Sequence, residues 1–404
     1  MNLFDFLFEF LDGGFLQLGI PALIVTTLLL THISTLAVTL YLHRFSAHRA
    51  LWLHPIVQHF FRLWLWLGTG MVTREWTAVH RKHHAECETE EDPHSPVMQG
   101  INKILWDQVG AYRIAAAKQE VLDRYGAGTP NDWLEKNVYS INSLGIAIMA
   151  TIDILLFGLI GITVWAIQMA WIPFVGGVIN GIGHWWGYRN FEPSDASRNI
   201  SPIGVLIGGE ELHNNHHTYP NSAKYSVRPW EFDIGWFYIR LLTLLGLARA
   251  LSTGPVVARR DDGRLDKDTA MALVNDRFNV MATYARTVVE PLVREKRTHA
   301  TGESRKLLRS GHRILCRDDL LLDARSREKL AHLIDVPELR MVYELRMRLQ
   351  AIWAKRTGNV EELVTALRTW CHDAEASGLA TLRTFVNEMQ RYSVPGSKAT
   401  GIPA

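Results

Sequence analysis

The sequence predicts an all-α protein in which integral membrane helices carry a histidine-rich cap and are followed by a soluble helical region. Three observations predict this class. Two apolar stretches, residues 15–42 and 141–186, are each long enough to cross a bilayer, which takes about 20 residues. Histidines gather in short clusters within the first 220 residues, close to these stretches. Residues beyond about 250 are charged, rich in arginine and patterned as helices.

Residues 1–14 are predicted to form an interfacial segment that does not cross the membrane. The apolar run 3–11 is interrupted by Asp5 and Glu9, and nine residues are too few to span a bilayer. Residues 15–42 contain no Asp, Glu, Lys or Arg, so we expect the first span there. This run is too long, and preceded by too few basic residues, to be a cleaved signal peptide.

Residues 55–72 are rich in Phe, Trp and Leu, yet we predict a helix that lies along the membrane face. Histidine clusters precede and follow this segment, and a crossing between them would place them on opposite sides of the bilayer. Clusters that bind one centre must lie on the same side. Trp64 and Trp66 suit the interface. The alternative is a spanning helix whose flanking clusters do not meet.

Residues 141–186 are apolar with a single acidic residue, Asp153, and are long enough for two spans. Gly158 and Gly161 lie near a break, so we expect spans at about 141–162 and 164–186. This hairpin returns the chain to its starting side and leaves every histidine cluster on one face. The basic residues that flank this face are Arg44, Arg49, Arg74, Arg81, Lys82, Arg189 and Arg198. Their excess predicts that the face is cytoplasmic.

A change in composition near residue 250 divides the chain. We assign residues 15–250 to the membrane domain and 251–392 to a charged helical domain of unknown role. The last dozen residues, 393–404, are rich in Gly, Pro and Ser and are predicted to be a disordered tail. The net charge of +2 gives no indication of a nucleic-acid partner.

The histidines that carry the chemistry form three clusters, and a fourth element pairs a histidine with an asparagine. They are His43 and His48; His80, His83 and His84; His213, His216 and His217; and Asn180 with His184. On a helix, the three histidines of an HxxHH motif share one face. Convergent imidazoles suit iron, copper, zinc or nickel. Nine histidines are too many for one metal, which takes about four to six ligands, so the count predicts two metals.

Other histidines and the cysteines are given different roles. HxxHH would rarely occur twice by chance among 17 histidines, but His54 and His59 repeat only the spacing of the first cluster, and Pro55 places them at a new helix. His94 lies in a turn and is expected to be structural. The three cysteines lie far apart, which excludes an iron–sulfur site within this chain, and we expect no redox role for Cys87.

The three clusters resemble the histidine boxes of the membrane-bound fatty acyl desaturases. The matching segments are HRFSAH at 43–48, HRKHH at 80–84 and HNNHH at 213–217. NGIGH at 180–184 resembles the asparagine–histidine element of the acyl-CoA, stearoyl-type delta-9 branch. Order and spacing match that branch over residues 15–250. The residues around 183–192 and 208–212 are similar to a bacterial subgroup, some members of which act on chains esterified in phospholipid.

The resemblance implies an enzyme that desaturates a saturated fatty acyl chain, with delta-9 position and a cis double bond. It implies two Fe²⁺ ions held by the nine histidines, with Asn180 bound through water, and O2 as co-substrate. Which histidine binds which iron is left open, as is the acyl carrier: CoA, acyl carrier protein or phospholipid. A bacterial inner membrane is the expected location.

The chain has no haem, flavin or iron–sulfur motif, so a separate electron donor such as a ferredoxin or a flavin reductase is the expected partner. Two alternatives remain at this point. A membrane alkane or lipid hydroxylase uses similar clusters, and a metal-binding membrane protein without enzymatic activity would also account for them.

Substrate residues are expected beside the metal ligands. The candidates to line an apolar tunnel are Trp76, Thr77, Trp185, Trp186 and Tyr188. The candidates to hold a phosphate or CoA headgroup are Arg49, Arg74, Arg81 and Arg189. Ordinary helix packing and anchoring at the membrane surface are the alternative roles of these two sets.

Overall fold

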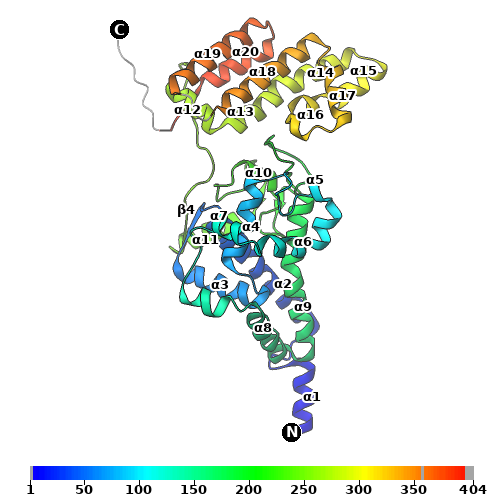
Figure 1. Ribbon diagram of the computed structural model, residues 1–404, viewed down its shortest axis with the longest axis vertical. Coiled ribbons are helices and arrows are strands. Elements are labelled where there is room, and N and C mark those ends of the chain that lie inside the picture. The colour runs from blue at the N-terminus through cyan, green and yellow to red at the C-terminus, as the bar shows by residue number, and fades with distance from the viewer. Residues whose placement is uncertain (1–2, 356–358, 396–404) are drawn as a thin grey trace. The chain divides into compact units, whose positions relative to one another are not determined.

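The computed structural model describes residues 3–355 and 359–395, and the chain divides into two compact units. Unit 1 comprises Met1–Arg189 and Asp195–Gly254, and unit 2 comprises Asn190–Ser194 and Pro255–Ala404. Most of the described residues are helical and every strand is two or three residues long (Figure 1). The predicted all-α class is therefore confirmed.

Unit 1 consists of helices and four short strands. Its helices are α1 (Leu3–Gly13), α2 (Ile20–Leu36), the π-helix η1 (Ala37–Ala47), α3 (Pro55–Thr69), α4 (Thr73–Ala85), α5 (Pro96–Gln99), α6 (Ile101–Ala116), α7 (Gln119–Tyr125), η2 (Glu135–Tyr139), α8 (Asn142–Phe157), η3 (Gly158–Ile160), α9 (Gly161–Gly177), η4 (Val178–Ile182), α10 (His213–Thr218) and α11 (Ile234–Leu244). Its strands are β1 (Leu51–Leu53), β2 (Ile203–Gly204), β3 (Phe232–Asp233) and β4 (Ala248–Ala250). Strands β1 and β4 pair antiparallel, whereas β2 and β3 pair parallel.

Helices α2 and η1 form one continuous rod, Ile20–Ala47, that is long and apolar enough to cross a membrane. The rod begins later than the expected residue 15, because the preceding turn bonds to the tip of another hairpin. There the backbone N–H groups of Phe15 and Leu16 donate to the carbonyls of Leu155 and Leu156 at 2.9 and 3.0 Å. The rod also extends past residue 42, so that His43 lies within its last, π-helical turns. Such π-helical turns are frequent at functional sites.

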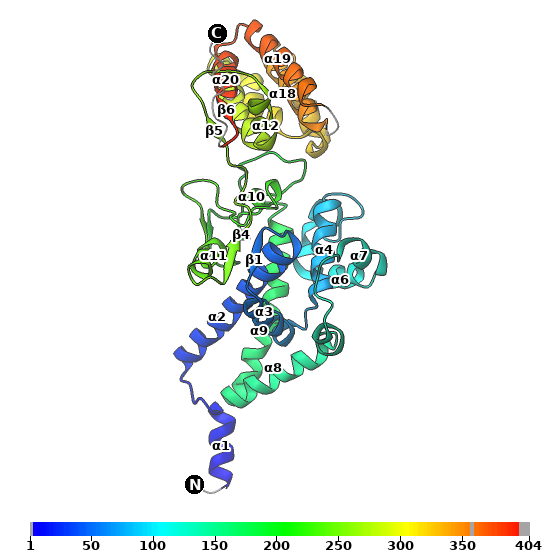
Figure 2. The ribbon, with the colours of Figure 1, turned by 90° about the vertical axis from the view of Figure 1, so that its left-hand side faces the viewer.

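Helices α8 and α9 form the second apolar stretch, Asn142–Ile182, and pack against each other as a hairpin (Figure 2). Gly158 breaks the stretch with a left-handed φ of +74°, which side chains rarely adopt. A Cβ on Gly161 would lie 2.1 Å from the Asp153 carbonyl oxygen, so the close approach of the two helices also needs glycine. The break thus lies at 158–161, a few residues before the position expected between 162 and 164.

Helix α3 has 15 residues, fewer than a bilayer crossing needs. His54 caps its first turn by accepting from the Ile56 N–H at 3.3 Å, and Pro55 takes the first helical position. The helix packs against α8 and α9. That α3 lies along the membrane face remains a prediction.

Unit 2 has its own hydrophobic core, which includes Trp370, Tyr284 and Phe385. Its helices are α12 (Lys267–Asn275), α13 (Arg277–Tyr284), η5 (Ala285–Val289), α14 (Glu290–His299), α15 (Gly302–Arg309), α16 (Gly311–Cys316), η6 (Asp319–Leu321), α17 (Ala324–Leu333), α18 (Pro337–Ala354), α19 (Val360–Ala376) and α20 (Ala380–Gln390). Its strands are β5 (Ala258–Arg259) and β6 (Tyr392–Ser393), which pair antiparallel.

The start of the predicted disordered tail needs correction. Ser393 is buried and lies opposite Ala258 in the β5–β6 pair, because Tyr392 beside it anchors the strand to the core of unit 2. Val394 also packs against this core, and residues 396–404 of the predicted tail lie outside the described residues.

Candidate metal centre

Four segments that are distant in sequence bring the histidine clusters together. The end of η1 carries the first cluster, α4 carries the second and α10 carries the third. The fourth element lies at η4 and the residues just after it. Both HxxHH motifs are helical, so their imidazoles share one face of each helix.

The first group of converging histidines contains five members. They are His43, His48, His80, His84 and His216, whose candidate ligand atoms all lie within 4.8 Å of one another. The Nε2 atoms of His43 and His216 are 3.0 Å apart, and those of His48 and His80 are 2.8 Å apart. The Nε2 atom of His84 lies 3.0 Å from that of His216. Ring nitrogens from three different segments therefore point at one position.

The second group contains the other four histidines. The ligand atoms of His83, His184 and His217 lie within 4.8 Å of one another, together with the thiol of Cys87. The Nε2 atom of His213 lies 3.0 Å from that of His184. The nine histidines thus divide into five and four, a division that spacing along the sequence left open.

Carboxylates hold the outer nitrogens of four of these rings. The Nδ1–carboxylate pairs are His43 with Glu210 at 2.8 Å, His83 with Asp92 at 2.9 Å, His184 with Glu88 at 2.9 Å and His217 with Asp195 at 3.3 Å. Each carboxylate accepts the Nδ1 proton, which leaves the Nε2 lone pair directed at the centre, as in many metal sites. Sequence reasoning missed these four residues. Glu88, Asp92 and Glu210 lie within nine residues of a histidine cluster. This proximity in sequence is the signal that could have identified them.

The donor set fits metal ions. When both rings are neutral and their Nδ1 atoms donate to Asp92 and Asp195, the Nε2 lone pairs of His83 and His217 face each other at 3.4 Å. Two acceptors cannot form a hydrogen bond, and a cation that both can bind relieves their repulsion. Burial also lowers the pKa of six of the rings well below the usual value, and they are His48, His80, His84, His213, His216 and His217. Neutral imidazole is the form that binds metals.

His83 is the exception among the ligands. Burial lowers its pKa, but the charge and hydrogen bond of Asp92 outweigh burial and raise the pKa above its usual value. His94 packs on His83 with ring centroids 4.3 Å apart, and its backbone N–H donates to Asp92. His94, which was expected to be a structural turn residue, therefore lies against the second histidine group.

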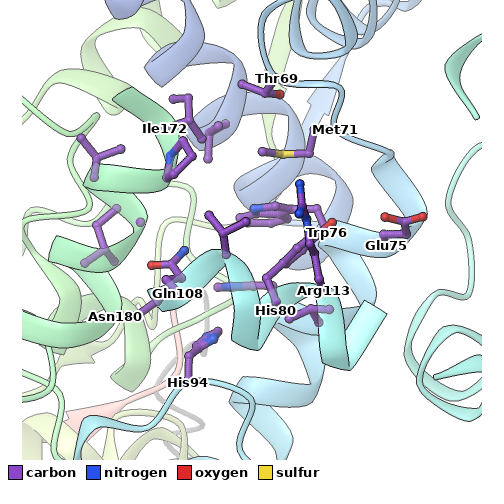
Figure 3. A pocket seen from close by; sticks show the side chains of 18 of the residues that line it. Thr69, Met71, Glu75, Trp76, His80, His94, Gln108, Arg113, Ile172 and Asn180 are labelled. Atoms are coloured by element: carbon purple, nitrogen blue, oxygen red, sulfur yellow. The ribbon is translucent and has the colours of Figure 1, made fainter. Parts of the chain in front are cut away.

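An apolar cavity of about 360 Å³ ends at the metal centre (Figure 3). His43, His80 and His213 line it together with Asn180. The ring of Trp76 stacks on that of His80, with centroids 4.9 Å apart and 11° between the planes. The apolar residues along the cavity include Val38, Met71, Val79, Val109, Ile146, Met169, Ile172, Val175 and Ile179.

Of the predicted tunnel residues, Trp76 lines this cavity and the other four do not. The Thr77 hydroxyl bonds to that of Ser46 at 2.7 Å. Trp185 and Trp186 are 55% and 63% exposed, and the Tyr188 hydroxyl donates to Glu231 at 2.7 Å. Adjacency to a ligand in sequence was a poor guide, because neighbouring side chains on a helix or loop point in different directions.

The predicted headgroup arginines hold loops of unit 1. Arg49 donates to the Ala127 carbonyl, Arg74 pairs with Asp123, and Arg189 donates to the carbonyls of Asp195 and Ser197. Arg81 donates to the carbonyls of Ser46, Ala47, Tyr125 and Ala127. Their role in holding a headgroup remains a prediction.

Comparison with known proteins adds the family. A family model described as fatty acid desaturase matches residues 18–233. The chain belongs to the fatty acid desaturase family. It is 30% identical over 248 residues to an sn-1 stearoyl-lipid 9-desaturase of Anabaena variabilis, which covers 60% of this chain and 87% of that protein. It is also 30% identical over 236 residues to Delta-9 acyl-lipid desaturase 1 of Arabidopsis thaliana, with coverages of 56% and 74%.

An Acyl-CoA 5-desaturase of Anemone leveillei is 28% identical over 239 residues, with 55% of this chain and 69% of that protein covered. The predicted family and the predicted fatty acyl desaturation are therefore confirmed. The desaturase acts on a lipid acyl chain, and its histidine groups form a metal centre.

A second family model, described as transposase, matches residues 269–395 of unit 2. Enzymes that cut nucleic acids with metal ions gather carboxylates around the ions. Among the described residues of unit 2, no three His, Cys, Asp or Glu side chains converge in this way. The match is a likeness in sequence.

Proposed function

We propose that this desaturase introduces a cis double bond at the delta-9 position of a saturated acyl chain, using two iron ions and O2. The observation that carries the proposal is the convergence of nine histidines, in groups of five and four, on one end of an apolar cavity. The names of two relatives, which specify position 9, support the position of the double bond.

The first ion would be held by the group of five and the second by the group of four, with Asn180 reaching the second through water. When bound, the irons and O2 supply an oxidant able to remove hydrogen from an unactivated methylene, which no side-chain base can deprotonate. The four carboxylates keep the Nε2 lone pairs directed inward by holding the Nδ1 protons of His43, His83, His184 and His217.

The cavity would bind and orient the acyl chain. Its apolar walls exclude water, and the stacked pair of Trp76 and His80 forms a rigid wall beside the centre. Orientation decides the product, because a small displacement of the reacting carbon separates loss of a second hydrogen from transfer of oxygen. Because the outcome depends on this positioning, hydroxylation by an alkane or lipid hydroxylase is the alternative function.

A chain esterified in a membrane lipid is the proposed substrate. The relatives named above from Anabaena and Arabidopsis act, by their names, on acyl lipids. Arg49, Arg74, Arg81 and Arg189 each already bond to a backbone carbonyl or a carboxylate. A lipid substrate can reach the cavity from the bilayer itself, so it needs no phosphate cluster.

A separate electron donor, a ferredoxin or a flavin reductase, would supply the two electrons. Unit 2 offers a positively charged surface on α14–α17. Within the described residues, the exposed arginines there that form no ion pair within 4 Å include Arg297, Arg305, Arg309, Arg313 and Arg327. Such a surface favours docking of an acidic partner. We expect that deleting residues 255–404 slows reduction by the donor and leaves the metal content unchanged, as stopped-flow spectroscopy and elemental analysis would show.

The basic residues that flank the histidine clusters support a cytoplasmic face of the inner membrane. Accessibility of single engineered cysteines at Arg74 and Arg189 to an impermeant thiol reagent tests this. Labelling in inside-out vesicles and not in intact cells is the expected result.

Expression in a desaturase-deficient host tests the function. Gas chromatography and mass spectrometry of total fatty acids should show a new cis delta-9 monounsaturated acid. His216→Ala should abolish it, and His54→Ala, which removes a histidine outside the metal groups, should not. A hydroxylated fatty acid would assign the chain to the hydroxylases. Absence of any product from purified, iron-loaded protein supplied with O2 and reductant would contradict the proposal.

A further inference from the structure

Cys87 lies directly against the second histidine group, although nothing in its sequence context indicates a role. Helix α4 ends at Ala85, and Cys87 lies in the turn that follows it, four residues after His83. Its sulfur is one of four candidate ligand atoms, with those of His83, His184 and His217, that lie within 4.8 Å of one another.

The surroundings of the sulfur point to a cation. The three imidazoles donate their Nδ1 protons to Asp92, Glu88 and Asp195, so their Nε2 lone pairs face inward. The sulfur shares this space with three lone pairs and is ringed by three carboxylates. A metal cation attracts the lone pairs, the sulfur and the carboxylates together. Cys316 and Cys371, by contrast, are buried in the core of unit 2.

We propose that Cys87 is a ligand of the second metal ion, which makes the two ions chemically unequal. On binding, the S–H bond breaks, a metal–sulfur bond forms and the proton leaves to water, without oxidation or reduction. The first group offers nitrogen ligands alone, whereas the second adds a soft sulfur donor to nitrogen. The proposal rests on the metal centre of the proposed function and is independent of which reaction that centre performs.

The test uses full-length protein, depleted of metal and loaded with Co²⁺. Cobalt in these sites absorbs visible light, and a cobalt–thiolate bond adds an intense charge-transfer band in the near ultraviolet. We expect both features in the unaltered protein and in the matched control Cys316→Ser. Cys87→Ser should keep the visible bands, lose the charge-transfer band and bind the second Co²⁺ at least about tenfold more weakly, the smallest loss typical even of partners outside the ligand set.

Thiol alkylation gives an independent readout. The Cys87 peptide, followed by mass spectrometry, should react with iodoacetamide in metal-free protein and be protected after loading. An unchanged charge-transfer band in Cys87→Ser, or equal alkylation with and without Co²⁺, would overturn the role of Cys87. Visible bands without a charge-transfer band in the unaltered protein would overturn the sulfur ligand alone. Absence of all cobalt bands would overturn both the histidine ligands and this proposal.

Discussion

Asp92→Asn tests whether the carboxylates orient the metal-binding histidines. The Asp92 side chain is fully buried and accepts three hydrogen bonds. Its Oδ1 accepts from His83 Nδ1 at 2.9 Å and from the His94 N–H at 3.1 Å, and its Oδ2 accepts from the Glu88 N–H at 3.0 Å. Asparagine has one side-chain oxygen in place of two. Either His83 and the His94 N–H, or the Glu88 N–H, must therefore face an amide NH2 group.

Either orientation of the amide harms the second group. If the amide nitrogen faces His83, it donates to Nδ1 and moves the ring proton to Nε2, which then cannot bind metal. If the oxygen faces His83, the amide nitrogen meets the Glu88 N–H and one buried donor is left unpaired, which costs about 1–3 kcal/mol. Loss of such a partner typically weakens metal binding about 10–100-fold, or roughly 1.4–2.8 kcal/mol. The two routes therefore predict the same order of loss.

The assay is chelator competition followed by elemental analysis of purified protein. Asp92→Asn should release one ion per chain at about 10–100-fold lower chelator concentration, and the other ion should remain bound as before. Asp123→Asn, which removes an exposed carboxylate paired with Arg74, is the matched control and should release neither ion early. Wild-type affinity for both ions in Asp92→Asn would refute the reasoning. So would simultaneous loss of both ions from a variant whose circular dichroism is unchanged.

Three further predictions follow from the same geometry. His48→Ala removes a nitrogen from the group of five and should lower the metal content, whereas His54→Ala, which alters only a helix cap, should not; equal elemental analyses would contradict the assignment. Ile172→Trp fills part of the cavity and should shift the products toward shorter acyl chains, and an unchanged chain-length profile by gas chromatography would show that the acyl chain lies elsewhere. Arg44→Met leaves a fully buried carboxylate without its partner, which costs about 3–5 kcal/mol, so the thermal midpoint should fall by several degrees; an unchanged midpoint would mean that the pair is not needed for stability.

Predictions that depend on local pattern succeeded. The long apolar stretches indicated helices able to cross a membrane, and the structure has two such stretches, Ile20–Ala47 and Asn142–Ile182. The HxxHH spacing indicated histidines on one helical face, and both motifs are helical. Element limits were less accurate. The turn before Ile20 is set by hydrogen bonds to Leu155 and Leu156, far along the chain, and no pattern near residue 15 reports them.

Residues that act through distant contacts were the ones missed. The cavity walls come from α6, α8 and α9 as well as α4, so Met169 and Ile146 line it although neither lies near a histidine cluster in sequence. Trp185 and Trp186 lie beside a ligand in sequence but point to the surface. No redox role was expected of Cys87 because the cysteines lie far apart, and two of the histidines beside it, His184 and His217, come from distant segments.

The sequence by itself determined the all-α class, the desaturase family and the nine histidines that the structure brings together, because helical period, apolar length and ligand spacing are local properties of the chain. Only the tertiary structure decided how the histidines divide into five and four, which carboxylates fix their tautomers, which side chains form the cavity, and that Cys87 faces the second group. These features depend on which faces of distant helices meet. Which faces meet is set by the packing of the whole unit, so residue spacing along the chain cannot predict it.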